Sequence, residues 1–180
     1  MKLDKNFTLE KYGLQVRLVK ENDADFIIKL RTNPLLSKYL HPISPDVDLQ
    51  KEWIRKYKYR EQDGIDYYFV FSKDGIDIGL ERIYDITSNS FTHGSFIFSL
   101  DSPFGSSILA DILTREIGFE IIKRPVNLFD VRKGNLSVVK YHKTYDAEII
   151  TENDESLFFK LEGHKFNKNK NRYLKMFTSI

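Results

Sequence analysis

Cysteine is absent from the 180 residues of this chain. Its absence excludes disulfide bonds, cysteine-ligated zinc, iron–sulfur clusters and thiol nucleophiles, and it fits a reducing compartment. The sequence also lacks any apolar run long enough to span a bilayer, and its first residues lead into no hydrophobic segment of the signal-peptide type. We therefore predict a cytoplasmic protein with no membrane partner.

An excess of charge of one sign is missing as well. The 28 Lys and Arg residues nearly balance the 26 Asp and Glu residues, for a net charge of +2. Composition therefore gives no case for a nucleic-acid partner. Aromatic residues, by contrast, make up 14% of the chain, and such rings fill cores and line ligand clefts. The length predicts a single domain over residues 1–180 with a sizeable core.

The first half of the chain predicts one strand, two helices and then a meander. Residues 1–12 read as a polar lead-in, and the alternation from Leu14 to Leu18 is typical of a half-buried strand. Asn22 or Asp23 can cap the first helix, and Asp46 or Asp48 the second, which ends at Asp63-Gly64. Three strand-like runs follow at 67–72, 76–86 and 91–100. Lys73-Asp74-Gly75 predicts a hairpin turn between the first two, so the runs form an antiparallel meander.

The second half changes to a strand–helix–strand pattern. A helical apolar period covers 106–122, a short strand covers 128–131, and another helix covers 136–145. This order implies a right-handed crossover and a parallel strand pair. A hairpin of strands 147–150 and 157–161 closes the sheet. The sequence thus predicts an α+β fold, with a mixed, mainly antiparallel sheet of about six or seven strands flanked by helices.

Two further segments bear on ligand binding. The turn Phe104-Gly105-Ser106-Ser107 lies where a strand passes into a helix, so backbone N–H groups and the helix dipole favour an anion there. The tail from Lys165 to Ile180 has five basic residues and no acidic one. A solvated terminus is the default expectation for such a tail, and a segment that contacts phosphate or a partner is the alternative. The apolar residues Tyr173, Leu174, Met176 and Phe177 indicate that part of the tail packs.

An ordered set of short motifs resembles the GNAT superfamily of acyl-CoA-dependent N-acyltransferases. The similarity runs from about Leu14 to Phe166, and it is greatest to the branch of ribosomal-protein-alanine acetyltransferases and nucleotide-sugar amine acyltransferases. It is carried by Val16-Arg17-Leu18, Asp23-Ala24-Asp25-Phe26, Leu30-Arg31-Thr32-Asn33-Pro34, Lys38-Tyr39-Leu40, Trp53-Ile54, Ile78-Gly79, Arg82-Ile83, Asn135 and Tyr141-His142-Lys143. The resemblance implies a GNAT-like sheet whose central parallel strands splay apart.

The resemblance also implies an acyl-CoA site around the Gly/Ser turn. The family motif Arg/Gln-x-x-Gly-x-Gly/Ala corresponds here to 102–107, where Gly105 matches the glycine and Ser107 is small. Ser102 replaces the Arg or Gln, and Pro103 has no N–H to donate. The diphosphate would then meet the N–H groups of Gly105, Ser106 and Ser107. The pantetheine arm would lie beside the strand end at Ser99 and Leu100 and contact Asn135.

The chemistry implied by the resemblance is direct attack of an amine on the thioester in a ternary complex. A base must deprotonate the amine, and Glu81, His93 and Asp101 are candidates. Burial would raise the pKa of Glu81 towards a useful range. The departing thiolate could receive a proton from His142, which stands where the family has a Tyr, or from Tyr141. No metal is implied.

The acceptor is predicted from the residues on the opposite side of the site. Arginine can pair with a diphosphate, and aromatic rings can stack on a base or sugar. We therefore favour a nucleotide-linked amino sugar, as in surface polysaccharide synthesis. Alternatives are a protein N-terminal acetyltransferase and a non-catalytic acyl-CoA-binding or regulatory module. Acyl chain length and homo-oligomer formation stay open. The predicted acceptor-side residues are Arg31, Asn33, Tyr39, Trp53, Arg82 and His93.

Overall fold

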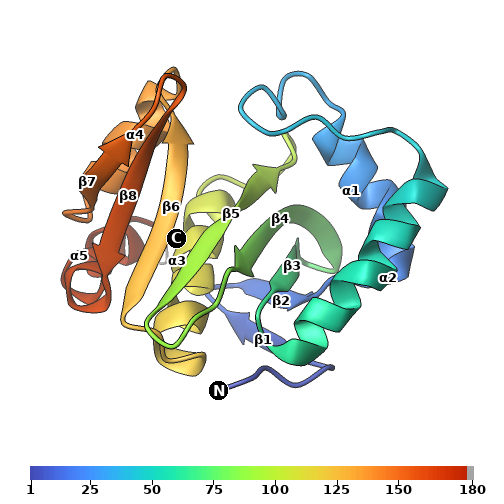
Figure 1. Ribbon diagram of the computed structural model, residues 1–180, viewed down its shortest axis with the longest axis horizontal. Coiled ribbons are helices and arrows are strands. Elements are labelled where there is room, and N and C mark those ends of the chain that lie inside the picture. The colour runs from blue at the N-terminus through green and yellow to red at the C-terminus, as the bar shows by residue number, and fades with distance from the viewer. Residues whose placement is uncertain (178–180) are drawn as a thin grey trace.

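A single mixed sheet organises the chain (Figure 1). The structure, a computed structural model, describes residues 1–177. In that range the strands are β1 (Thr8–Lys11), β2 (Leu14–Leu18), β3 (Tyr67–Lys73), β4 (Ile76–Tyr84), β5 (Ser90–Phe98), β6 (Val126–Arg132), β7 (Glu148–Glu152) and β8 (Ser156–Glu162). They lie in the order β1-β2-β3-β4-β5-β6-β8-β7. The helices are α1 (Ala24–Arg31), α2 (Val47–Asp63), α3 (Ser106–Glu116), α4 (Leu136–Lys143) and α5 (Gly163–Phe177).

The helices cover both faces of the sheet. On one face α1 and α2 bury Ile27, Leu30 and Ile54 against Val70 of β3 and other strand residues. On the other face α3 packs on the strands β2 to β5, while α4 and α5 pack on β6 and β8. A short 3-10 turn, η1 (Glu21–Asp23), precedes α1, and a π-helical turn, η2 (Ile117–Ile121), continues α3. None of the described helices is both long and apolar enough to cross a bilayer.

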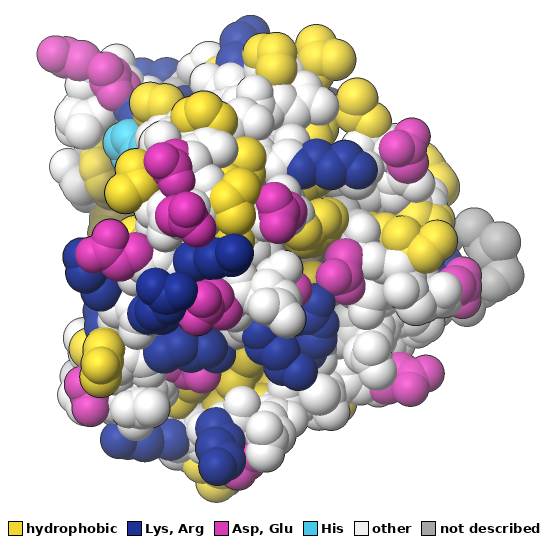
Figure 2. Space-filling model, turned by 90° about the vertical axis from the view of Figure 1, so that its right-hand side faces the viewer, with side chains coloured by type: hydrophobic (Ala, Val, Ile, Leu, Met, Phe, Trp, Pro, Cys, Tyr) yellow, Lys and Arg dark blue, Asp and Glu magenta, His cyan; other side chains and the backbone are white. Residues whose placement is uncertain are grey.

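Local signals in the sequence account for the boundaries of α2 and for the hairpin after it. The Asp46 carboxylate accepts hydrogen bonds from the N–H groups of Asp48 and Leu49, which confirms Asp46 as the cap. Gly64 ends the helix with φ +77°. Asp74 and Gly75 adopt φ +52° and +77° in the turn between β3 and β4, as predicted. Figure 2 shows basic and acidic side chains side by side on the face that α2 covers.

The parallel pair β5–β6 opens part-way along its length. Pairing runs from Ser90↔Val126 to Thr92↔Leu128, and the two strands then diverge. Beyond that point β5 also carries a bulge, because the register to β4 passes from Arg82↔Gly94 to Leu80↔Ile97. Two residues of β5 therefore face a single residue of β4, and Ser95 adopts φ +53°. The predicted splayed pair is confirmed, and the bulge bends β5 at the opening.

Two sequence expectations are corrected. Residues 1–12 are not a polar lead-in, because they contain β1 and pack Leu3, Phe7 and Leu9 on the core. The basic tail is not a solvated terminus over 163–177, because it forms α5, which buries Phe166 and packs Leu174 and other apolar side chains beneath the lysines. Helical spacing of apolar residues explains the second case. The last three residues of that tail lie outside the described range.

Candidate active site

A cavity of about 580 Å³ lies where β5 and β6 diverge. That volume is typical of small-molecule sites. The cavity wall combines the segment after α1, the bulged part of β5, the first turns of α3, the end of β6 and the start of α4. The lining residues are Arg31, Leu36, Tyr39, Leu40, His41, Tyr84, His93, Gly94, Ser95, Phe96, Ser107, Ile108, Asp111, Phe129, Asp130, Val131, Arg132, Asn135, Ser137, Val138, Tyr141 and His142.

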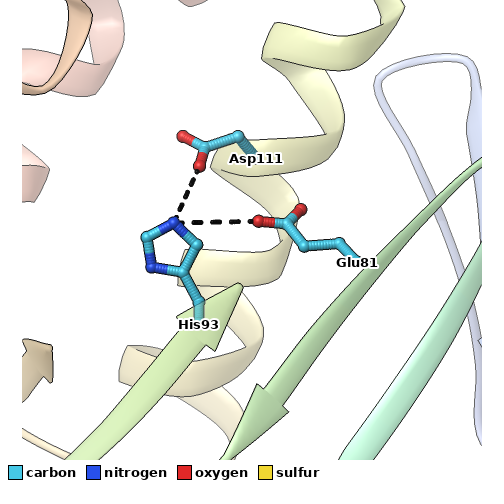
Figure 3. Close-up of side chains that lie close together, drawn as sticks. All are labelled: Glu81, His93 and Asp111. Carbon is cyan, nitrogen blue, oxygen red and sulfur yellow. Dashed lines mark ion pairs between the residues drawn. The ribbon is translucent and has the colours of Figure 1, made fainter. Parts of the chain in front are cut away.

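A buried cluster of ionisable groups forms the inner end of the cavity. Figure 3 shows the His93 imidazole, from β5, facing the carboxylates of Asp111 on α3 and Glu81 on β4. The Nε2 atom of His93 lies 3.4 Å from Oδ1 of Asp111 and 3.9 Å from Oε1 of Glu81. The Tyr141 hydroxyl donates to Oδ2 of Asp111 over 2.7 Å. The Thr114 hydroxyl donates to Oε2 of Glu81.

Arg115 ties this cluster together. It lies one helical turn after Asp111 on α3, and its side chain is 0% exposed. Its Nε is 3.2 Å from Oδ2 of Asp111, and one terminal nitrogen contacts Nε2 of His93 at 3.3 Å and Nδ1 of His142 at 2.9 Å. A guanidinium keeps its charge in proteins. The inner end of the cavity therefore contains a permanent buried cation beside the Asp111 carboxylate.

The Gly/Ser turn meets the cavity at the start of α3. Gly105 adopts φ +81° as the N-cap, and a Cβ there would lie 2.4 Å from Cδ1 of Phe177 on α5, so only glycine fits. Ser107 lines the cavity. The N–H of Ser106 instead donates to the Pro103 carbonyl. Ser107 is therefore the residue of this turn that lies at the cavity wall.

Comparison with solved structures decides the family. FdhC, described as a nucleotide-linked sugar GNAT, is 35% identical, with 96% of this chain and 99% of that chain covered and a TM-score of 0.85. The chain belongs to the GNAT family. A scan against protein-family models and a search of curated proteins each found no match.

More distant GNAT structures share the fold. A ribosomal-protein-alanine acetyltransferase from Vibrio fischeri is 17% identical over 87% of this chain and 97% of its own, with a TM-score of 0.71. The spermidine N-acetyltransferase of Vibrio cholerae in complex with CoA and spermine is 16% identical over 87% of this chain and 99% of its own, also with a TM-score of 0.71. The present GNAT is accordingly an acyl-CoA-dependent N-acyltransferase with the predicted α+β fold.

The predicted acyl-CoA and catalytic residues of this GNAT fall into two groups. Ser107, Asn135, Tyr141 and His142 all line the cavity. Glu81 is fully buried behind the cavity wall, with its Oε1 3.9 Å from the lining residue His93. Four other predicted acyl-CoA residues do not line the cavity, namely Ser99, Leu100, Gly105 and Ser106. The base candidate Asp101 does not line it either.

The predicted acceptor residues of the GNAT are likewise divided. Arg31, Tyr39 and His93 line the cavity. Asn33 uses its side chain to accept from the N–H of Leu35. Trp53, on α2, stacks on Tyr57 with ring centroids 5.6 Å apart and packs, partly buried, against the core. Arg82 forms a hydrogen-bonded ion pair with Asp66 and lies over Trp53.

The environment of the inner cluster shifts its pKa values in different directions. Burial, then the charge of Asp111, raises the pKa of Glu81 well above its ordinary value. For Asp111 burial acts in the same direction, but the charge of Arg115 and the hydrogen bond with His93 outweigh it and lower the pKa. Burial and then Arg115 lower the pKa values of His93 and His142. At neutral pH the cluster therefore contains ionised Asp111 and Arg115 with neutral imidazoles.

The geometry of Glu81, His93 and Asp111 also resembles a metal site. Each offers one ligand atom, and these atoms lie within 4.8 Å of one another. The guanidinium of Arg115, however, contacts both Asp111 and His93. A second cation at this position would be repelled at short range in a buried environment. The donor set therefore fits an arginine-centred polar network rather than a metal ion.

Sequence reasoning missed Asp111 and Arg115, and also His41 and Arg132 at the cavity. Asp111 and Arg115 are spaced i, i+4 on α3, a pattern that usually marks a surface ion pair. They are buried because α3 packs on the sheet on one side and near α4 and α5 on the other. The apolar residues on both sides of Asp111, at 108–110 and 112–113, were the signal available.

Proposed function

We propose that this GNAT transfers an acyl group from acyl-CoA to the amino group of a nucleotide-linked amino sugar. The observation that carries the proposal is the similarity to FdhC, which is described as a nucleotide-linked sugar GNAT and matches over nearly the whole length of both chains. The proposal extends that protein's described substrate class to this chain.

The charge of the outer part of the cavity supports an anionic acceptor. Arg31, whose guanidinium donates to the His41 carbonyl, and Arg132, which pairs with Glu155 on the surface, both line the cavity. Guanidinium groups pair with phosphate through parallel hydrogen bonds. Tyr39, Tyr84 and Phe96 add aromatic surface on which a base or sugar ring can stack.

Acyl-CoA would bind along the starts of α3 and α4. The first N–H groups of a helix have no intrahelical acceptor, and Ser107 at the start of α3 lines the cavity. This helix start is suited to the CoA diphosphate. Asn135 caps α4 and also lines the cavity, where its side chain can contact the pantetheine arm. The thioester would then approach the inner cluster from between β5 and β6.

The inner cluster supplies the groups that the reaction needs. The amine nitrogen bonds to the thioester carbonyl carbon, the amine proton passes to His93 directly or through water, and the C–S electron pair leaves on sulfur. His93 lines the cavity as a neutral ring. Its Nε2 faces Asp111, and its Nδ1, which has no hydrogen-bond partner among the described residues, is the nitrogen that can take the proton. Glu81 acts only through His93, since it does not reach the cavity. His142 and Tyr141 line the cavity from α4 and would face the departing sulfur.

A substrate panel tests the proposal. The purified protein is incubated with acetyl-CoA or longer acyl-CoA and, in separate reactions, with dTDP- or UDP-amino sugars, a peptide with a free N-terminus, or spermidine. Product mass is then measured. We expect an acylated nucleotide sugar and a released thiol. Acylation of the peptide alone would favour the protein acetyltransferase alternative. If no acyl-CoA binds in calorimetry, the protein is a non-catalytic module.

A further inference from the structure

The hydrogen bond between Arg115 and His142 fixes where the imidazole proton lies. A terminal nitrogen of Arg115 is 2.9 Å from Nδ1 of His142. A guanidinium has five N–H donors and no acceptor atom. The Nδ1 atom must therefore offer its lone pair, which leaves the ring proton on Nε2. His142 lines the cavity, so its remaining nitrogen is available there as a donor.

The surroundings of Arg115 keep it from releasing this bond. Its guanidinium lies 5.0 Å from the centroid of the Phe129 ring and 5.3 Å from that of Tyr145, which holds it between two aromatic rings. Its Nε is paired with Asp111. The side chain is fully buried, away from bulk water. The orientation of the donor towards His142 is therefore set by packing.

Other groups near His142 do not compete for its Nδ1 atom. The Tyr141 hydroxyl donates to Asp111. His93 approaches His142 ring to ring, with centroids 5.9 Å apart, and its Nε2 contacts a terminal nitrogen of Arg115 and Asp111. Glu81 is bonded to Thr114. Asp111 balances the charge of Arg115, and Arg115 remains the donor to the Nδ1 atom of His142.

We propose that Arg115 is a positioning residue that holds His142 in its neutral Nε2–H tautomer, so that His142 donates a hydrogen bond to the departing sulfur without giving up a proton. As the C–S bond breaks, its electron pair moves to sulfur and the Nε2–H group stabilises the thiolate. The sulfur takes a proton from solvent after release. The proposal rests on acyl transfer from a thioester and does not depend on the identity of the acceptor.

The first experiment measures the tautomer directly. Two-bond ¹H–¹⁵N spectra are recorded on the intact protein with ¹⁵N-labelled histidine between pH 6 and 9, with surface residues His41 and His164 as references. We expect His142 to show a proton on Nε2 throughout. A protonated ring or an Nδ1–H ring in the wild-type protein would overturn the proposal, whatever the fate of any variant.

The second experiment separates hydrogen-bond donation from proton transfer. In His142→Gln the side-chain amide can still donate but has no acidic proton to give, whereas His142→Phe retains only the ring volume. We expect kcat of His142→Gln to stay within about tenfold of wild type and that of His142→Phe to fall about 100-fold. Equal losses in the two variants would refute the role as a donor. In Arg115→Met, which removes the donor to Nδ1, the His142 signals should show a mixed or altered tautomer, and an unchanged spectrum would remove Arg115 from this role.

Discussion

The two ends of the cavity differ in how they are held. The inner end is built from β4, β5, α3 and α4, where Arg115 is fully buried and joins Asp111 to two imidazoles. The outer end is formed by the segment between α1 and α2, where an exposed hydrogen bond from the Tyr39 hydroxyl to the Gly134 carbonyl crosses to the β6–α4 side. Rigid buried networks fix reacting groups, whereas exposed segments open at low free energy.

We therefore expect the two ends of the cavity to have different functions. Changes at the inner end should affect kcat and the stability of the fold together, because the same side chains carry both. Changes at the outer end should affect KM for the acceptor and leave the fold intact. Substitutions at either end can break that division, and the largest effect is expected at the inner end.

Loss of the buried cation should destabilise the fold most. In Arg115→Met, Asp111 remains buried without its counter-charge, and we expect the free energy of unfolding to fall by about 3–5 kcal/mol. Urea denaturation measures the change. Arg55→Met is the matched control, because its partner Glu21 is on the surface and the Arg55 side chain is 60% exposed. Solvent screens that pair, so Arg55→Met should leave the free energy of unfolding nearly unchanged. Similar losses in both variants would contradict the account of the inner end.

Removal of His142 should mainly affect the chemical step. We expect His142→Ala to lower kcat about 100-fold, the size typical of a lost transition-state donor, with a smaller change in KM for acyl-CoA. Steady-state kinetics with varied acyl-CoA give both constants. An unchanged turnover number would show that His142 takes no part in the chemical step. It would also contradict the assignment of the reacting groups to the inner end.

The buried imidazoles should make the fold sensitive to acid. The pKa of His142 is lowered from 6.5 by burial and then by Arg115. The unfolded chain therefore binds a proton that the folded chain does not, so stability falls as pH drops below 6.5. The raised pKa of Glu81 changes the stability in the opposite direction as pH drops. Both the wild type and His142→Phe contain Glu81, so its contribution largely cancels when their stabilities are compared. Between pH 6.5 and 5 the wild type should lose up to about 1.4 kcal/mol per pH unit more than the variant. Parallel curves would show that His142 is not buried as a neutral ring.

Loss of a cation at the outer end should weaken acceptor binding selectively. We expect Arg132→Gln to raise KM for the nucleotide sugar about tenfold, or about 1.4 kcal/mol, with little change in kcat. The neighbouring Lys133 pairs with Glu152 and does not line the cavity. Lys133→Gln is therefore the control. Equal effects of the two substitutions would indicate general electrostatics rather than a contact.

The smallest effect is expected for the hydrogen bond across the outer end. Tyr39→Phe removes the donor to the Gly134 carbonyl, and such a bond contributes about 0.5–1.5 kcal/mol. Amide hydrogen exchange in the segment 33–45 should speed up several-fold, while exchange in α3 stays constant. Faster exchange in α3 as well would show that the two ends are coupled.

Much of the fold followed from local signals, whereas the centre of the site did not. The cap at Asp46, the Asp74-Gly75 turn and the strand–helix–strand order each depend on neighbouring residues, and each prediction was confirmed. The burial of Arg115 depends on what packs around α3, which a single sequence does not reveal. β1 and α5 were missed for the same reason, since their few apolar residues are buried only by distant elements.

A competition assay tests the central claim most directly. Acetyl-CoA is mixed with equal concentrations of a nucleotide-linked amino sugar, a peptide with a free N-terminus and spermidine, and the products are identified by mass spectrometry after limited turnover. We predict that the nucleotide-linked amino sugar is the acceptor that becomes acylated, and that Arg132→Gln reduces this preference. Preferential acylation of the peptide or of spermidine would contradict the assignment of the outer end to an anionic acceptor.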